Sequence, residues 1–536
     1  MNDSSTLVKT SLTTILTAMA VCTLALFIFT HNKADVDLWG NVGFVEHFAT
    51  SPEFIRTNTF SFTEPDHIWV NHEWLAEYIL HQTHRVFGNP GLLLLKALLG
   101  FTLIAIIYQS MRKRCPSAST RVIYLMLIIS TLGYGFSTRP HLFTYILIAA
   151  LLSALLRILD TTHIKLATRR VTHSLEISNS PRYTLYALCF VAAPLGCIWA
   201  NLHGAFFIGQ ILLLLAFTYS LTRHITGFDK QWRTTLILGI SSIAYFGGTL
   251  LNPYGISLWS FVFDSAAILR PILSEWAPFN PLVNFSDHVD FVVLVAITII
   301  GMVISFRNCS GFGTLILILT LVAAFSMRRN IPLFAIVAGL VATESMGISF
   351  GSKIDNILKE FNKPLIIFLL LCATATSSLF MVKNNRGGPF QILVPREQFP
   401  IDAVAFLERN NIQANAIVFF DWAELCIWKL YPNCRVFLDG RFKSAYSEPA
   451  ITAYLDFIYA KDNPLTALNN YPTDLVFTHI NNPCTAIMRN QDGWEVIYKD
   501  NMAIIFAKRS AHEEFFKNLA RKSAYVPDGS EDNLFP

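Results

Sequence analysis

Two aspartates separated by one residue follow the first apolar run of the sequence. Asp35 and Asp37 lie in the segment 34–39. On an extended chain alternate residues point to one side, so the two carboxylates would face one ligand, whereas on a helix they would diverge. Carboxylates of this kind can act as a general base or bind a divalent cation. Asp37 could also cap a helix that runs through Phe44 and Phe48, and the two interpretations are compatible.

Other residues that could do chemistry stand in the same loop and at the ends of later apolar runs. They are His72, Glu73, Arg139, His141, Asn201, His203, Asn252, Tyr254, Glu275, Arg328 and Arg329. Carboxylates and arginines near a bilayer are costly unless they are solvated or paired, and any one of them alone is typical of a solvated interfacial residue. Together around one cavity they would suit an anionic headgroup, a divalent cation, or a general base beside an arginine clamp.

Some of these residues have plain structural explanations. Asn252 and Tyr254 stand in a turn sequence with Pro253 and Gly255, and His203 stands in a similar turn,. His72 and Glu73 are not a zinc signature, because no second histidine follows at helical spacing,. Arg328 and Arg329 oppose the usual distribution of cations across a membrane, which favours phosphate binding by at least one of them.

Composition identifies the class of protein that must position these residues. The chain has 536 residues, of which 53% are hydrophobic and 15% charged, against about 25% charged in an average soluble domain. The apolar residues lie in long runs, as in a membrane protein. A net charge of +4 without a basic stripe argues against a nucleic-acid partner,. Nine cysteines without a CxxC pair indicate neither a zinc site nor a thioredoxin-like motif,.

The apolar runs predict about eleven transmembrane helices. The first, 7–29, is long enough to span and is followed by no small-residue cleavage site, which favours a retained helix over a signal peptide,. The others are 91–110, 121–137, 141–159, 183–199, 203–221, 234–251, 290–306, 312–326, 331–347 and 364–382. Several are shorter than about 20 residues, so some of them could be tilted pairs or broken helices. Segment 256–270 predicts a short re-entrant or interfacial helix, and 73–86 predicts an amphipathic helix on the membrane surface.

Lys and Arg gather in alternate short loops, and this predicts the orientation. The N-terminus would be cytoplasmic, in the inner (cytoplasmic) membrane, so the loop 31–90 and the tail would be extracytoplasmic,. We therefore expect a transmembrane domain over 1–384 that includes this large first loop, and a C-terminal extracytoplasmic α/β domain over 385–536.

The tail has the pattern of a small α/β domain. A helix is predicted over 401–409, and strands over 416–420, 435–438, 474–478 and 503–506,. Asp439 and Arg441, after the second strand, predict a structural ion pair at a turn. In an oxidising compartment Cys434 could pair with Cys426 or with Cys484, and three cysteines leave one over.

The motifs taken in order resemble a poorly characterised bacterial group of integral-membrane glycosyltransferases of the GT-C superfamily. The matching residues are Asp35-x-Asp37-Leu38-Trp39, Asn71-His72-Glu73-Trp74-Leu75, Arg139-Pro140, Asn201-x-His203-Gly204, Asn252-Pro253-Tyr254-Gly255, Glu275-Trp276 and Asp439-Gly440-Arg441. The resemblance runs over nearly the whole chain. Gly40 departs from it, because the group commonly has a second tryptophan there; this could widen the site or alter how the acceptor packs.

The resemblance implies a polyprenyl-phosphate-linked sugar donor, a glycan, lipid or protein acceptor, and inversion at the anomeric carbon. It makes Asp37 the first choice for the catalytic base, with Asp35 as the alternate, and gives Glu73 an assisting role. Asp37 and Glu73 would hold a divalent cation if one is required. Arg139, Arg328 or Arg329 would bind the donor phosphate. The remaining candidates, His72, His141, His203, Asn201, Asn252, Tyr254 and Glu275, would bind substrate.

A non-enzymatic membrane protein is the alternative hypothesis, either a transporter or a lipid-handling or envelope-assembly protein. Transporters commonly have inverted repeats and charged residues at mid-membrane. The sequence contains no evident repeat, and charges inside its apolar runs are rare. The long first loop and the folded tail favour an enzyme that faces the membrane surface.

Overall fold

A computed structural model describes residues 3–49, 56–168, 180–228, 232–266, 274–360, 363–384, 390–513, 516 and 535. The chain forms two compact units. The bundle unit comprises Met1–His31, Leu93–Val262 and Ala266–Arg386. The loop–tail unit comprises Asn32–Leu92, Phe263–Ser265 and Gly387–Pro536. The first loop thus belongs to the same compact unit as the C-terminal tail, and each unit is described by itself.

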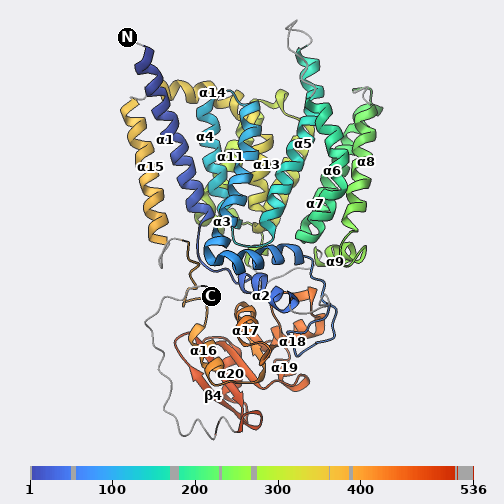
Figure 1. Cartoon of the computed structure of the whole chain (residues 1–536), viewed down its shortest axis with the longest axis vertical. Helices are drawn as coiled ribbons and strands as arrows, with labels where there is room; N and C mark the ends of the chain where they lie inside the picture. Colours follow the sequence, from blue (N-terminus) through green and yellow to red (C-terminus); the bar gives the residue numbers. More distant parts are fainter. Residues whose placement is uncertain are drawn as a thin grey trace. The chain divides into compact units, whose positions relative to one another are not determined.

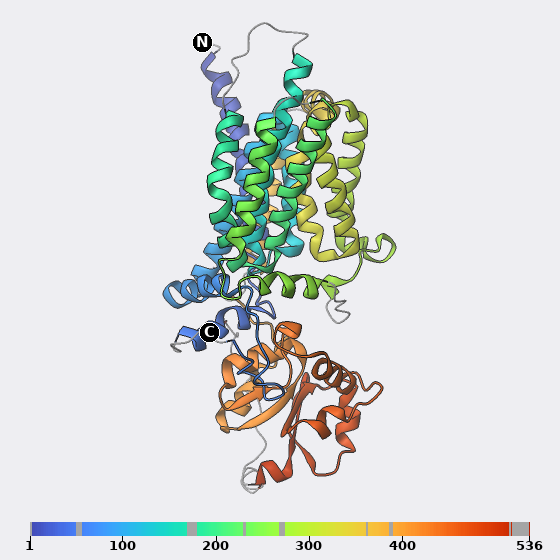
Figure 2. The ribbon, with the colours of Figure 1, turned by 90° about the vertical axis from the view of Figure 1, so that its right-hand side faces the viewer.

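Helices build the bundle unit, most of them apolar, and several run alongside one another (Figures 1 and 2). They are α1 (Asp3–Phe29), the second half of α3 (Trp74–Arg114), α4 (Ala118–Leu132), α5 (His141–Thr168), α6 (Ser180–Leu202), α7 (Phe207–Ile225), α8 (Trp232–Thr249), α9 (Ser257–Ala266), α10 (Pro281–Asn284), α11 (Val289–Ile304), α12 (Gly311–Ser326), α13 (Ile331–Val341), α14 (Thr343–Glu360) and α15 (Lys363–Asn384). Short 3₁₀ turns join them, among them η1 (Gly133–Gly135), η2 (Gly204–Phe206), η3 (Ser274–Trp276) and η6 (Arg328–Asn330).

The described residues contain six helices long and apolar enough to cross a membrane, or seven if one bent pair counts as a span. Three shorter apolar helices, Ile15–Phe29, Gly311–Ser326 and Ile367–Leu379, add to them. The chain is therefore an integral membrane protein with several apolar helices. The predicted helix 256–270 corresponds to α9, and its residues 267–270 lie outside the described part of the chain.

The apolar run 331–347, one of those shorter than about 20 residues, is broken into two helices,. Two helices, α13 and α14, meet there at an angle of 67°. Every residue of α13 except Leu333 is buried, whereas α14 mixes polar and charged residues with apolar ones. An apolar run can thus end in an amphipathic helix, which follows a different direction because its polar face needs solvent.

Glycines allow α6 and α8 to approach each other closely. A Cβ atom added at Gly196 of α6 would lie 2.3 Å from the carbonyl oxygen of Tyr245 in α8. One added at Gly248 of α8 would lie 2.0 Å from the carbonyl oxygen of Ala193 in α6. In lipid no hydrophobic driving force brings helices together. They associate instead through close packing, which small residues at the contact allow.

The helix α3 joins two predicted elements across a break. Gly88 has a φ of 61° inside α3 and separates the amphipathic segment 73–86 from the apolar segment 91–110. In the first half Ala76 and Leu80 are buried, while Tyr78 and Val86 are exposed. The first half is therefore amphipathic, as the sequence predicts.

A five-stranded sheet forms the core of the loop–tail unit. The strands are β1 (Ala414–Val418), β2 (Cys434–Val436), β3 (Leu475–His479), β4 (Trp494–Lys499) and β5 (Ala503–Lys508), in the order β2-β1-β3-β5-β4. β1 is parallel to β2 and β3, and β5 is antiparallel to β3 and β4. Four of the strands agree with the predicted ones, and β4 was not predicted because Glu495 and Lys499 leave it only a short apolar run.

Helices surround this sheet, and the first loop adds to its edge. The helices are α2 (Leu38–Ala49), α16 (Ile401–Arg409), α17 (Ala423–Leu430), α18 (Glu448–Ile458), α19 (Thr466–Asn470) and α20 (Cys484–Arg489); Figure 1 labels most of them. Val436 of β2 donates its backbone N–H to Phe60 over 3.2 Å and accepts that of Phe62 over 3.3 Å. The loop is therefore part of the folded unit.

The three tail cysteines do not pair in the structure. Cys426, Cys434 and Cys484 are buried free thiols. The thiol of Cys434 contacts the carbonyl oxygen of Ile412 over 3.2 Å, and that of Cys484 contacts the hydroxyl of Thr478 over 3.7 Å. Neither disulfide considered from the sequence is present.

Candidate active site

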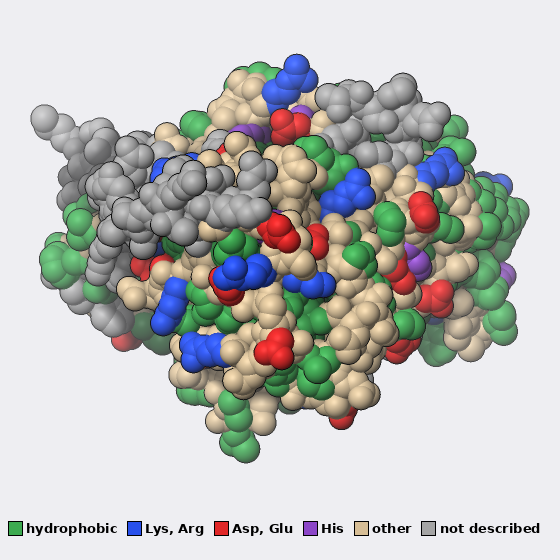
Figure 3. Space-filling model, turned by 90° about the horizontal axis from the view of Figure 1, so that it is seen from below, with side chains coloured by type: hydrophobic (Ala, Val, Ile, Leu, Met, Phe, Trp, Pro, Cys, Tyr) green, Lys and Arg blue, Asp and Glu red, His purple; other side chains and the backbone are tan. Residues whose placement is uncertain are grey.

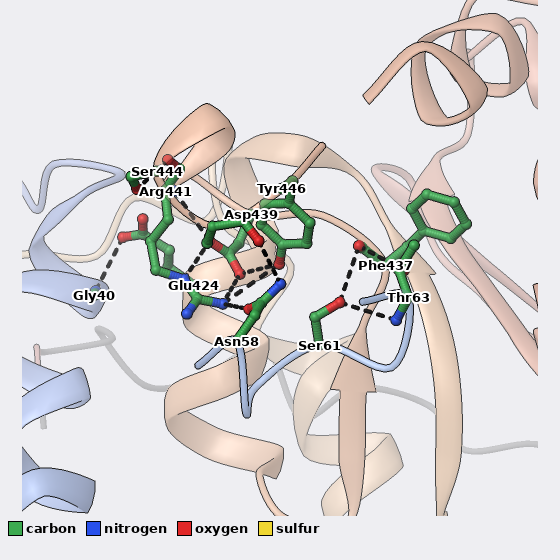
Figure 4. Close-up of polar contacts among 11 residues, drawn as sticks. Gly40, Asn58, Ser61, Thr63, Glu424, Phe437, Asp439, Arg441, Ser444 and Tyr446 are labelled. Carbon is green, nitrogen blue, oxygen red and sulfur yellow. Dashed lines mark hydrogen bonds and ion pairs between the residues drawn. The ribbon is translucent and has the colours of Figure 1, made fainter. Parts of the chain in front are cut away.

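A buried ion pair lies at the turn that follows β2. Arg441 donates two hydrogen bonds to Asp439, from Nε over 2.8 Å and from Nη2 over 2.7 Å. The Tyr446 hydroxyl donates to Asp439 over 2.6 Å, and Asn58 of the first loop accepts from Arg441 over 2.6 Å (Figure 4). Burial alone would lower the pKa of Arg441, but the charge of Asp439 outweighs it and raises that pKa. Arg441 therefore stays cationic, and the predicted Asp–Arg tie is present.

Four aromatic rings enclose the Arg441 guanidinium. Its central carbon lies 4.7 Å from the ring centroid of Trp69, 5.1 Å from those of Phe44 and Phe60, and 5.8 Å from that of Tyr446. Guanidinium groups over aromatic faces are attracted by the ring quadrupole, and more strongly where water is excluded. Phe44 belongs to α2, and Phe60 and Trp69 to the first loop. Arg441 thus joins the tail turn to the segment that carries Asp35 and Asp37.

Asp37 directly precedes α2. Its carbonyl oxygen accepts the backbone N–H of Asn41 over 3.0 Å, which is the first bond of that helix. The side chain of Asp35 accepts the backbone N–H of Asp37 over 3.1 Å. The two aspartates therefore form the start of α2.

A carboxyl group from the tail meets this helix start. Glu424 of α17 accepts the backbone N–H of Gly40 over 3.0 Å, in a buried contact. Burial, followed by the nearby charges of Asp37 and Asp439, raises the pKa of Glu424 well above its usual range. A Cβ added at Gly440 would lie 2.3 Å from Glu424 Oε1 and 3.7 Å from Asp37 Oδ1, so the two carboxyl groups are neighbours.

Glu73 and His72 lie at the start of α3. Glu73 Oε1 lies 3.5 Å from His72 Nε2, and the backbone N–H of Glu73 donates to Asn71 Oδ1 over 3.1 Å. One turn later Glu77 is buried and accepts a hydrogen bond from Asn71 Nδ2 over 2.6 Å. Among the described residues no group of three or more His, Cys, Asp and Glu could hold a metal ion.

In the bundle unit, two predicted residues form an ion pair at η3. Arg139 Nη1 lies 3.5 Å from Glu275 Oε2, and the two side chains are 19% and 41% exposed. Beside Glu275, Trp276 lies under the guanidinium of Arg329 at 4.5 Å from the ring centroid. The backbone N–H of Arg328 donates to the carbonyl of Ala277 over 3.1 Å, which holds η6 against η3.

Two histidines of the bundle unit lie near each other. The rings of His141 and His203 are 6.4 Å apart. His141 Nε2 contacts the carbonyl of Gly135 over 2.6 Å, and His203 Nδ1 contacts the hydroxyl of Thr144 over 3.0 Å. These contacts fix the two rings at the start of α5 and the end of α6.

The asparagines of the turn motifs are bonded to backbone. Asn201 donates to the carbonyls of Cys197 over 2.7 Å and Leu251 over 2.9 Å. Asn252 donates to Thr249 over 2.7 Å and accepts the backbone N–H of Tyr254 over 2.7 Å. Both amides shape the ends of α6 and α8, which agrees with the structural interpretation of these motifs.

The sequence did not single out Glu424 or Glu77. Each was detectable only as a carboxylate within an otherwise apolar helical stretch, since a buried charge needs a partner,.

On the exposed surface the charges are mixed: in Figure 3 acidic and basic side chains are interspersed over the visible face. Such mixing is typical of a solvated surface.

Two solved structures share the fold of this chain. One is the Archaeoglobus fulgidus oligosaccharyltransferase in the apo form, with a TM-score of 0.52 and 14% identity, over 88% of this chain and 69% of that one. The other is the archaeal oligosaccharyltransferase AglB from Archaeoglobus fulgidus in complex with an inhibitory peptide and a dolichol-phosphate, with a TM-score of 0.53 at the same identity and coverage. No protein-family model matches the sequence, and no curated protein matches it. The chain therefore shares the fold of these archaeal oligosaccharyltransferases.

Proposed function

We propose that this protein is a membrane glycosyltransferase that moves a sugar from a polyprenyl-phosphate-linked donor to an extracytoplasmic glycan, lipid or protein acceptor. The observation that carries the proposal is the meeting of the first loop and the tail. Asp37, at the start of α2, lies beside Glu424 and the Asp439–Arg441 turn in a chain with a GT-C fold. A catalytic group must be held in a fixed geometry by the residues around it, and the buried Asp439–Arg441 ion pair supplies that rigidity,.

Asp37 is the proposed general base. The acceptor hydroxyl oxygen attacks the anomeric carbon, the bond between that carbon and the donor phosphate oxygen breaks, and the electron pair leaves with the phosphate. The acceptor proton passes to the Asp37 carboxylate. Asp35 is the alternate base, and Glu73 orients the acceptor. The resemblance to the superfamily implies inversion at the anomeric carbon.

Arginines of the bundle unit are the proposed ligands of the donor phosphate. Arg139, Arg328 and Arg329 would offset the charge that develops on the leaving phosphate. Arg139 is already paired over 3.5 Å with a half-exposed Glu275, and such a pair exchanges its carboxylate for an anionic ligand at little cost,. A neighbour in fold binds a dolichol-phosphate, which is a lipid phosphate of the same chemical class. His72, His141, His203, Asn201, Asn252, Tyr254 and Glu275 would contact the substrates or shape their binding surfaces.

The proposal includes an orientation. The N-terminus faces the cytoplasm, the chain lies in the inner membrane, and both the first loop and the tail domain from about residue 385 are extracytoplasmic, as the distribution of Lys and Arg indicates,. Labelling of single cysteines at positions 37 and 328 by an impermeant reagent tests this. Labelling of the two from opposite sides of the membrane would contradict the proposal.

The decisive experiment compares surface glycans by mass spectrometry in a deletion strain. Complementation with the wild-type protein should restore a glycan product that the deletion removes. Asp37→Asn should lower that product by roughly 10²–10⁴-fold at equal protein abundance, the usual contribution of a general base. Asp66→Asn, at an exposed aspartate of the same loop, is the matched control and should have no effect. An unchanged glycan profile in the deletion strain would favour a transport or assembly role.

A further inference from the structure

The start of α2 is held by a residue from the tail. Gly40 is the third residue of α2, and its backbone N–H is one of the donors that a helix leaves without a partner in its first turn,. Glu424, 384 positions away in sequence, accepts this hydrogen bond over 3.0 Å. In most helices the side chain of the residue just before the helix accepts such a first-turn N–H. Here the accepting carboxyl oxygen comes from the tail.

Two glycines make room for the Glu424 carboxyl group. A Cβ added at Gly40 would lie 2.4 Å from Glu424 Oε2 and 2.6 Å from the ring of Phe44. A Cβ added at Gly440 would lie 2.3 Å from Glu424 Oε1. Figure 4 shows Glu424 between Gly40 and the turn that carries Asp439 and Arg441. Each carboxyl oxygen therefore faces a glycine, and any side chain at either position would displace the group.

Gly40, where the sequence departs from the resemblance, is thus matched in the structure by the Glu424 carboxyl group. In the group that the sequence resembles, a second tryptophan is common at this position, and such a side chain and Glu424 would occupy the same space. The buried carboxyl group fills that space here and bonds to the helix that begins after Asp37.

We propose that Glu424 and Gly40 form a matched pair in which Glu424 caps α2 from the tail and thereby positions Asp37 for proton transfer. The inference rests on the proposed function for the role of Asp37, but not for the capping contact. Glu424 is a positioning residue, because it acts on the reaction through the helix start. Burial and the nearby charges of Asp37 and Asp439 raise the pKa of Glu424, which favours its neutral carboxyl group, and glutamine at this position keeps both the shape and an accepting oxygen,.

Hydrogen exchange tests the capping contact without reference to activity. In the purified full-length protein, Glu424→Ala should speed exchange of the peptide covering residues 37–44 by about tenfold, the fold-change expected for a lost cap. Glu424→Gln should leave this exchange at the wild-type rate, as should Glu408→Ala, which changes an exposed glutamate of α16. Exchange in β3 should not change in any of these variants. Wild-type exchange of 37–44 in Glu424→Ala would overturn the inference, as would faster exchange throughout the tail.

The glycan assay in the complemented deletion strain tests the consequence for transfer. Glu424→Ala should lower the product by about tenfold at equal abundance, and Glu424→Gln should restore it. Gly40→Ala should also lower it, and Glu424→Ala added to Gly40→Ala should cost less than the two single losses combined. Strict additivity, or failure of glutamine to restore transfer, would overturn the positioning role. Two results together would separate the proposals: faster exchange of 37–44 in purified Glu424→Ala, and glycans that do not change when the gene is deleted. They would overturn the proposed function and leave the capping contact standing.

Discussion

Two arginine–carboxylate pairs, one in each unit, use the same residue types under opposite conditions. Arg441 and Asp439 of the loop–tail unit lie 2.7 Å apart with side chains 4% and 0% exposed. Arg139 and Glu275 of the bundle unit lie 3.5 Å apart, and both have access to solvent. Breaking a buried pair leaves a charge without compensation, whereas a solvated pair contributes little to stability and can open. The comparison suggests that the first pair holds the site together and that the second is available to a ligand.

The largest effect should come from removing the buried arginine. Arg441→Met leaves Asp439 buried without its guanidinium and should destabilise the protein by about 3–5 kcal/mol. The measurement is the thermal unfolding midpoint of the purified full-length protein. Arg435→Met, at an exposed position of β2, is the control and should change little. The double variant Asp439→Asn/Arg441→Met should recover part of the stability lost in Arg441→Met. If Arg441→Met were as stable as the wild type, the buried and solvated pairs would not differ in their contribution to stability.

The next effect concerns the solvated arginines and transfer. Arg329→Ala removes a cation that lies over Trp276, and we expect the glycan product to fall by about tenfold to a hundredfold while thermal stability stays close to that of the wild type,. Arg307→Ala changes an exposed arginine at the other end of a bundle helix and serves as the control. The contrast would be reversed if Arg329→Ala unfolded the protein and left transfer intact in the folded fraction.

A pH titration sharpens the comparison at Glu424. Its folded-state pKa is raised, chiefly by burial and then by Asp37 and Asp439, so the folded protein keeps a proton that the unfolded chain releases. The stabilising contribution is complete below the ordinary glutamate pKa, about 4.3, and is lost as pH rises through the folded pKa. The wild type should lose stability relative to Glu424→Gln with a slope of up to about 1.4 kcal/mol per pH unit. A difference between the two proteins that is flat across pH 4–8 would show that Glu424 is ionised in the folded state.

The smallest effect belongs to the solvated pair. Glu275→Gln should change the free energy of unfolding by no more than about 1 kcal/mol, because the two groups lie 3.5 Å apart and both side chains reach solvent,. A double-mutant cycle with Arg139→Met measures the interaction. A coupling as large as that of the buried pair would remove the reason for treating Arg139 as available to a donor phosphate.

Local patterns were sufficient for much of the fold. The apolar runs predicted the bundle helices, and the amphipathic and apolar halves of α3 were both predicted, because hydrophobic periodicity is a property of neighbouring residues,. Four tail strands and α16 were predicted for the same reason. The strand β4 was missed because its apolar run is short. The break within 331–347 was not located, because an apolar run does not show where its direction changes.

The sequence by itself determined which residues could do chemistry: Asp35 and Asp37, the arginines at span ends, and the Asp439–Arg441 turn, whose partners are two residues apart. Only the tertiary structure decided that Glu424 meets Gly40, that Phe44, Phe60 and Trp69 enclose Arg441, and that the first loop folds with the tail. The physical reason is separation along the chain. A contact between positions 384 residues apart depends on how whole elements pack together, and no local spacing records it.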